Sequence, residues 1–217
     1  PAPVKTLRDS TVIKIFERNQ WKNMTIVTDF TGSMTPYIQQ VYYWYKLTYA
    51  TKDINEFVFF NDGDRKPQYL KIAGYTGGIY YSNSVVKDSM FKAAFRCKNA
   101  GDGGDIEENN IEAVLFAIKK NPELKEVYMI ADNYADMRDY KLMERVKIPV
   151  HIILCGVDKG KPLNTEYLDL ARQTNGSVHT MEDDLENLKS LAEGATITIG
   201  GFEYKILGGR FVKIRRA

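Results

Sequence analysis

A short β-branched run that ends in an acidic residue constrains the fold of this chain more than any other segment. Residues 25–28 (TIVT) are typical of a buried strand, and Asp29 follows them directly. The chain then turns into a helix that we expect to open near Pro36. Asp29, Thr31 and Ser33 are spaced at i, i+2 and i+4 in this tight loop, so one carboxylate and two hydroxyls can converge on one point.

All three of these side chains offer oxygen, which is the ligand that a hard divalent cation such as Mg²⁺ prefers. The segment Asp-Phe-Thr-Gly-Ser-Met at residues 29–34 resembles the metal-ion-dependent adhesion site of von Willebrand factor type A (vWA) domains, whose pattern is Asp-x-Ser/Thr-x-Ser. The resemblance extends over residues 23–193 through the order of the expected elements. It implies an α/β fold with a bound Mg²⁺, with Ca²⁺ or Mn²⁺ as alternatives.

Length and composition are those of an ordinary globular protein. With 217 residues, 44% of them hydrophobic and 27% charged, the chain can bury a sizeable core. A net charge of +2 is far from the strongly basic charge that is typical of nucleic-acid-binding proteins. No apolar run approaches the ~20 residues of a membrane span. Cys97 and Cys155 are too far apart in sequence for a thiol metal site and are expected to be structural. The start at Pro1 mildly favours an exported protein over a cytoplasmic one.

Strand-like and helix-like segments alternate after Asp29, which predicts an α/β fold with a mostly parallel sheet covered on both faces. The resemblance implies that this is the three-layer, doubly wound, vWA- or Rossmann-like fold. An Asp-Gly turn at residues 61–64 favours a hairpin, followed by a loop at 74–81. The expected strands are 56–60, 68–72 as a returning edge, 127–131, 150–154 and 177–179, and the expected helices are 36–50, 84–97 capped by Ser84, 110–120, 139–146, 164–174 and 183–193.

The end of the chain has a different pattern. Three β-like runs at 196–199, 202–207 and 211–214 are joined by Gly-Gly pairs, which suit tight hairpins. We therefore expect a small antiparallel meander. The predicted organisation is a lead-in segment at residues 1–22, a vWA-like domain at 23–194 and the meander at 195–217.

The resemblance implies two further loops at the metal site. The second precedes the helix at 110–120 and usually supplies Thr; here Asp105 takes that position, with Asp102 as the alternative. The third follows a strand and carries an acidic residue, which Asp132 matches. The predicted metal ligands are therefore Asp29, Thr31, Ser33, Asp105 and Asp132. Each residue alone is as easily explained by capping or a turn. Three acidic residues on one edge of a sheet, however, would repel one another without a cation.

An aspartate in place of Thr changes the charge of such a site. Asp29, Asp105 and Asp132 together carry three negative charges against two positive charges on the metal. We expect firmer retention of the metal, tolerance for Ca²⁺, and a weaker demand for an acidic partner group.

The resemblance implies a non-enzymatic adhesion or assembly module, in which an acidic side chain of a protein partner completes the metal shell. One alternative is a Mg²⁺-dependent, phosphatase-like hydrolase that uses Asp29. Such enzymes need a second carboxylate two residues later, where Thr31 stands. The other alternative is a metal-free scaffold that assembles through the meander. No Gly-x-Ser-x-Gly occurs, and His151 and His179 are expected to be structural.

Overall fold

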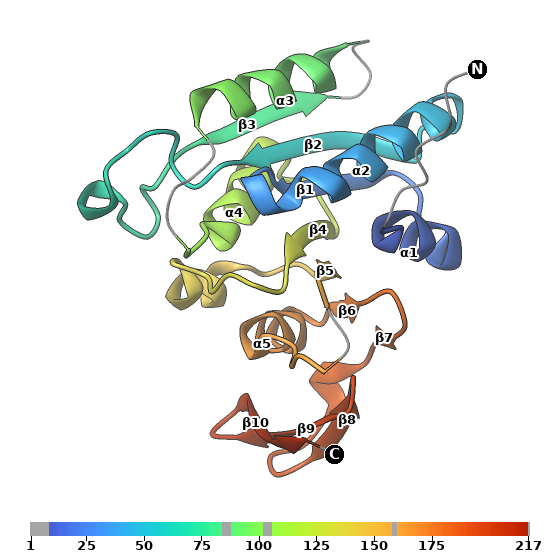
Figure 1. Ribbon diagram of the computed structural model, residues 1–217, viewed down its shortest axis with the longest axis vertical. Coiled ribbons are helices and arrows are strands. Elements are labelled where there is room, and N and C mark those ends of the chain that lie inside the picture. The colour runs from blue at the N-terminus through green and yellow to red at the C-terminus, as the bar shows by residue number, and fades with distance from the viewer. Residues whose placement is uncertain (1–8, 84–87, 102–105, 158–159, 217) are drawn as a thin grey trace.

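The computed structural model describes residues 9–83, 88–101, 106–157 and 160–216. They form an α/β fold with a seven-stranded, mostly parallel sheet and a separate three-stranded antiparallel sheet (Figure 1). The larger sheet has the strand order β3-β2-β1-β4-β5-β6-β7, and only the edge strands β3 and β7 pair in the antiparallel sense. The α/β class, the mostly parallel sheet and the C-terminal antiparallel meander are thereby confirmed.

The elements follow the alternation expected from the sequence. The strands of the larger sheet are β1 (Met24–Asp29), β2 (Ile54–Phe60), β3 (Ile79–Asn83), β4 (Val127–Asp132), β5 (Val150–Cys155), β6 (Ser177–His179) and β7 (Asp184–Leu185). The helices are α1 (Thr11–Asn19), α2 (Thr35–Thr48), α3 (Ser89–Ala100), α4 (Asn110–Lys120) and α5 (Thr165–Thr174). No helix in the described ranges combines the length and apolar character that a membrane crossing requires.

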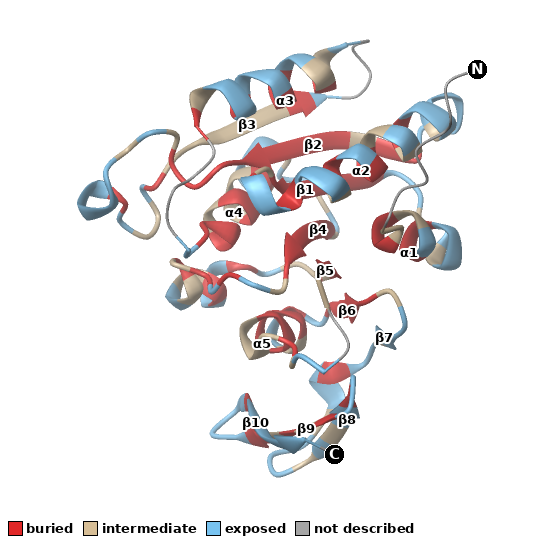
Figure 2. Cartoon of the chain, in the orientation of Figure 1, coloured by how far each residue is buried: buried red, intermediate tan, exposed pale blue. Residues whose placement is uncertain are grey.

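Both faces of the larger sheet are buried, as the red central strands of Figure 2 show. Successive side chains of a strand point to opposite faces, and in β1 Ile26 and Val27 belong to two different buried clusters. The cluster of Ile26 contains the apolar sides of α1, α2 and α3 together with the free, buried Cys97 and Cys155. The cluster of Val27 contains those of α4, α5 and the meander. Continuous apolar strands are therefore explained by burial on both sides.

Helix α1 was not expected from the sequence. Val12, Ile15 and Phe16 are spaced at i, i+3 and i+4 and are buried against the sheet. The Gln40 side-chain oxygen accepts a hydrogen bond from the Val12 N–H at 2.9 Å, and the Asp9 carboxylate accepts one from the Thr11 N–H at 2.8 Å. Two side chains outside the helix thus satisfy its first N–H groups.

The returning edge strand predicted at residues 68–72 is wrong. This segment contains a 3-10 turn at Gln68–Leu70, and the edge strand is β3, further along the chain. Ile79, Tyr80 and Tyr81 are aromatic or β-branched and fit a pleated, half-buried edge. Lys71 instead lies buried in an ion pair with Asp62, which holds its segment away from the sheet.

The helix predicted at residues 183–193 is also wrong. Asp184 and Leu185 form β7, and the left-handed backbone of Asn187 (φ 57°) ends any helical run before the 3-10 turn Leu188–Ser190. The helix predicted at 139–146 is a 3-10 helix at Tyr140–Arg145. The helix predicted at 84–97 begins at Ser89 in the described residues, and its expected cap Ser84 lies outside them.

The meander consists of β8 (Thr196–Ile199), β9 (Phe202–Leu207) and β10 (Arg210–Arg216). All four glycines of its two turns have positive φ between 56° and 79°, which is the geometry of tight hairpins and favours glycine. The meander packs on α5: the Asp169 carboxylate accepts the Phe211 N–H at 2.7 Å, and the Tyr204 hydroxyl accepts the Leu163 N–H at 2.7 Å. The division of the chain into residues 1–22, 23–194 and 195–217 stays a prediction.

The N-terminus of α4 is capped from a distant segment. Asp139 is fully buried, and its carboxylate accepts hydrogen bonds from the Ile111 N–H at 3.2 Å and from the Glu112 N–H at 2.5 Å. Burial raises the pKa of Asp139 from 3.8 to about 7, although the two N–H groups oppose this rise. The hydrogen bonds of this cap therefore offset only part of the free-energy cost of burying the charged carboxylate.

Replacing Asp139 by alanine is expected to lower the free energy of unfolding by about 2 kcal/mol, because two buried N–H groups lose their acceptor. Chemical denaturation would measure the change, with the exposed Asp136→Ala as control.

Because the folded-state pKa is raised, the contribution of Asp139 to stability falls as pH rises from about 4 to about 7. Asp139→Asn should flatten that part of the pH profile. An unchanged profile would contradict the burial of the charge.

Candidate functional site

Two of the predicted ligands lie at the carboxyl ends of adjacent parallel strands. β1 ends at Asp29 and β4 ends at Asp132. Thr28 pairs with Ile130, so these two strand ends lie beside each other at the centre of the sheet. Ligands of open α/β sheets bind beyond this edge, and particularly where the chain order reverses, as it does between β1 and β4.

Hydrogen bonds join the four predicted ligands that the structure describes into one cluster. The Ser33 hydroxyl donates to Asp132 Oδ2 at 2.5 Å, and the Thr31 and Ser33 hydroxyl oxygens are 3.3 Å apart. The Thr31 N–H donates to Asp29 Oδ1 at 2.8 Å. The loop is thus folded so that its two hydroxyls lie between the two strand ends. Asp29, Thr31, Ser33 and Asp132 are brought together as the sequence predicts.

Burying the charged Asp29 carboxylate at this site raises the free energy of the folded state when no cation is bound. Asp29 is 1% exposed. Burial raises its pKa from 3.8 to about 7, the hydrogen bonds from Thr31 oppose this rise, and repulsion by Asp132 and Asp62 adds to it. A negative charge buried beside others of the same sign costs free energy unless a positive charge offsets it.

The structure adds Glu108 to the surroundings of this cluster, a residue that the sequence analysis did not select. Its side chain is 4% exposed, and Oε2 has no hydrogen-bond partner among the described residues. Burial is the main cause that raises the pKa of Glu108 to about 11, followed by repulsion from Asp29, Asp62 and Asp132. Burial and this repulsion both favour the protonated form of the Glu108 carboxyl.

Glu108 reaches this position through backbone pairing. Its N–H donates to the Asp136 carbonyl at 2.9 Å, and its carbonyl accepts the Arg138 N–H at 2.8 Å. The segment before α4 therefore runs alongside the segment after β4. Glu108 belongs to the loop that the vWA resemblance assigns to the second part of the site. The predicted ligand Asp105 and its alternative Asp102 lie outside the described residues.

A buried ion cluster supports the same edge of the sheet. Asp62 is fully buried and pairs with Lys71 Nζ at 2.8 Å and with an Arg138 guanidinium nitrogen at 3.1 Å. The Arg138 guanidinium also donates to the Glu107 carbonyl at 2.8 Å. Residues from three loops are thereby fixed relative to one another next to the candidate site.

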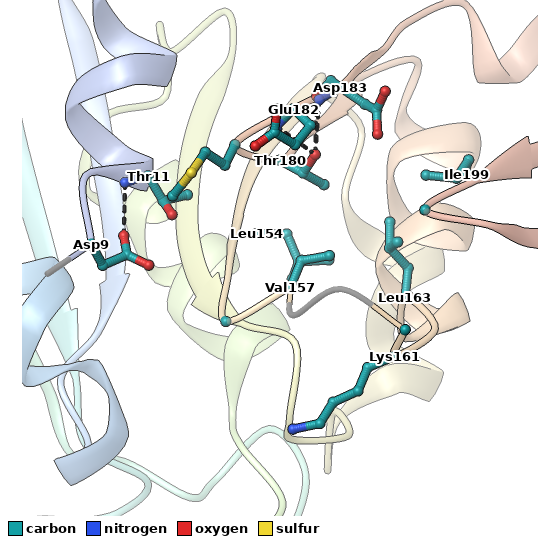
Figure 3. A pocket seen from close by; sticks show the side chains of 14 residues that line it. Asp9, Thr11, Leu154, Val157, Lys161, Leu163, Thr180, Glu182, Asp183 and Ile199 are labelled. Atoms are coloured by element: carbon teal, nitrogen blue, oxygen red, sulfur yellow. Dashed lines mark hydrogen bonds between the residues drawn. The ribbon is translucent and has the colours of Figure 1, made fainter.

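Two of three neighbouring cavities are lined by residues of the candidate site. One of about 400 Å³ opens over Ser33 and Asp132. Gly156 and Lys161 line both this cavity and a neighbouring one of about 420 Å³. Figure 3 shows that Asp9 and Thr11, at the start of α1, face Glu182 and Asp183 across this neighbouring cavity. The third cavity, of about 520 Å³, begins at Thr31 and runs between α2 and α3.

Both histidines lie in a hydrogen-bonded chain at the far end of the sheet. The Ser177 hydroxyl lies 2.7 Å from His151 Nδ1 and 2.6 Å from His179 Nε2, and His179 Nδ1 lies 2.6 Å from the Asp184 carboxylate. The sequence predicts a structural role for both histidines, and these hydrogen-bond partners could not be identified from it. Ser177 and His179 are 4% and 1% exposed and line none of the three cavities. This arrangement favours a structural role.

The described part of the chain contains no group of three or more His, Cys, Asp or Glu side chains placed to hold a metal ion. A cation at the candidate site would therefore depend on hydroxyl oxygens together with Asp29 and Asp132.

Comparisons with models of protein families, with curated proteins and with solved structures found no match. The assignment of a function consequently depends on the geometry of the site.

Proposed function

We propose that this chain is a vWA-like module, with the three-layer, doubly wound arrangement of that family, that binds a divalent cation and through it a protein partner. The observation that carries the proposal is the convergence of Ser33, Thr31 and Asp132 beside Asp29. These side chains come from two segments far apart in sequence, and they meet at the carboxyl edge of a parallel sheet.

The chemistry of the donor set fits Mg²⁺ better than a softer metal. All four side chains offer oxygen, and the described set contains no sulfur or imidazole. The two carboxylates balance the charge of a divalent cation. The Ser33 hydroxyl would donate its proton to Asp132 while its oxygen faces the metal. When bound, the cation supplies an electrophilic position that attracts an anionic oxygen from outside.

The partner would contribute that oxygen from an aspartate or glutamate side chain. The cavity over Ser33 and Asp132 provides room for it. Exposed aromatic side chains on neighbouring loops, Tyr134 at 79% and Tyr75 at 80% exposure, offer contact area around the site.

The first test is isothermal titration of MgCl₂, CaCl₂ and MnCl₂ into the metal-free protein. We expect one site that is lost in Ser33→Ala and Asp132→Asn. Thr35→Ala and Asp136→Asn are matched controls, since both residues are exposed and lie near the site without belonging to it. Absence of binding by all three metals at millimolar concentration would contradict the proposal.

Asp105→Thr tests the charge of the site. We expect weaker Mg²⁺ binding in this variant, because one negative charge near the cation is removed. Calorimetry on both proteins at one ionic strength would measure the ratio of the affinities. Equal or tighter binding by the variant would show that Asp105 contributes no attraction to the metal.

Partner binding should depend on the metal and on Asp29. A pull-down with the wild-type protein in Mg²⁺ is expected to retain a partner that is lost on adding EDTA and lost in Asp29→Ala. A partner that stays bound in EDTA and disappears on deletion of residues 196–217 would instead favour a metal-free assembly role for the meander.

A further inference from the structure

An apolar groove begins at the candidate metal loop. Its volume is about 520 Å³, within the range of about 300–1,000 Å³ that is typical of ligand sites. Thr31 and Gly32 form one end, and the groove continues between α2 and α3. Thr31 therefore lines this groove and also belongs to the hydrogen-bonded cluster of the candidate site.

The lining is rich in aromatic side chains. Phe30 packs edge-to-face on Phe59 at a ring-centroid distance of 5.6 Å, and Tyr42 lies 5.4 Å from Phe91. These contacts fix the walls of the groove. Phe95, by contrast, is 69% exposed although it lines the groove. The groove is thus preformed but leaves apolar surface uncovered.

The polar groups of the groove give it a charge preference. Lys98 lies on its rim and is exposed. No described acidic side chain forms an ion pair with Lys98. Within the described ranges, the lining of the groove contains no acidic residue. An apolar groove with a positive rim is complementary to a ligand that combines apolar and acidic groups.

We propose that this groove receives a large apolar or aromatic side chain of the protein partner, next to the acidic side chain that completes the coordination of the cation. The inference rests on the proposed function and specifies the partner's chemistry. The recognised segment carries an aspartate or glutamate with a Phe, Tyr, Trp or Leu close by. A further acidic group in that segment would pair with Lys98.

The test uses the Mg²⁺-loaded full chain and a display library of short peptides with one fixed aspartate and random flanking positions. We expect enrichment of aromatic and large aliphatic residues near the aspartate, together with a second acidic residue that pairs with Lys98. One enriched peptide is then synthesised and titrated. Phe95→Ala and Lys98→Glu should each weaken its binding about tenfold, the effect of losing one buried apolar contact or one charge pair.

Matched variants separate the groove from general surface effects. Lys92→Glu reverses a charge on the exposed side of the same helix without lining the groove, and Leu47→Ala removes an apolar side chain of 60% exposure from α2. Both should leave peptide affinity unchanged within about twofold. All four residues are exposed, so the variants should fold, which circular dichroism would verify.

The outcomes distinguish the two proposals. If calorimetry shows metal binding but no peptide is selected, or if selected peptides show no apolar preference, the groove inference is overturned and the metal site stands. Equal binding by Phe95→Ala and by the wild type would also overturn it. If no metal binds while apolar, acidic peptides still require Phe95 and Lys98, the groove is supported and the metal-dependent function fails.

Discussion

Replacing Asp62 by alanine is expected to lower the free energy of unfolding by about 3 kcal/mol or more. Asp62 is fully buried, and the side chains of its two cationic partners are 1% exposed for Lys71 and 8% for Arg138. Removing the carboxylate takes away the negative charge that pairs with both buried cations. The cost of burying positive charge then falls on the folded state.

Urea denaturation at neutral pH would measure this effect. Glu203→Ala is a suitable control, because Glu203 pairs with Arg215, whose side chain is 72% exposed. Such surface pairs contribute about 0–1 kcal/mol. A loss for Asp62→Ala no larger than that of the control would mean that the buried cluster does not stabilise the loops around the site.

The fold could be predicted from the sequence where a segment carries its own periodicity. β1, β4, β5 and α4 have continuous apolar runs or a clear helical stripe, and their boundaries differ from the expected ones by a residue at most. The errors fall where a tertiary contact overrides local preference. Lys71 is held by Asp62, and Asp184 accepts from His179 and Arg18 instead of lying in a helix.

The same distinction applies to the candidate site. Asp29, Thr31 and Ser33 lie within five residues, so their spacing alone predicted that they converge. Asp132 followed from the order of the strands. Glu108 could not be selected in this way, because its place depends on pairing between the segment before α4 and the segment after β4. Neither segment has a pattern that specifies the other.

Asp29→Asn is expected to have opposite effects on stability and on metal binding. Because the pKa of Asp29 is raised to about 7, the folded state binds more protons than the unfolded state between about pH 4 and pH 7. Its contribution to the free energy of unfolding therefore falls as pH rises through that window. Asparagine keeps an oxygen to accept the Thr31 N–H and carries no charge. The metal-free variant should be more stable than the wild type above pH 7 and nearly equal to it near pH 4.

Adding Mg²⁺ should reverse this ranking. The wild type gains stability as the cation binds only the folded state, by about 2.7 kcal/mol when free Mg²⁺ is a hundred times the dissociation constant. The variant should gain much less, because the amide oxygen of asparagine lacks the negative charge with which Asp29 attracts the cation. Thermal denaturation of both proteins with Mg²⁺ and with EDTA would measure the crossing. If Asp29 served only to hold its loop, both proteins would respond to Mg²⁺ alike. If the variant is the more stable protein in EDTA and the wild type is the more stable protein in Mg²⁺, the charge of Asp29 serves to bind the cation. The same charge then destabilises the fold when the metal is absent.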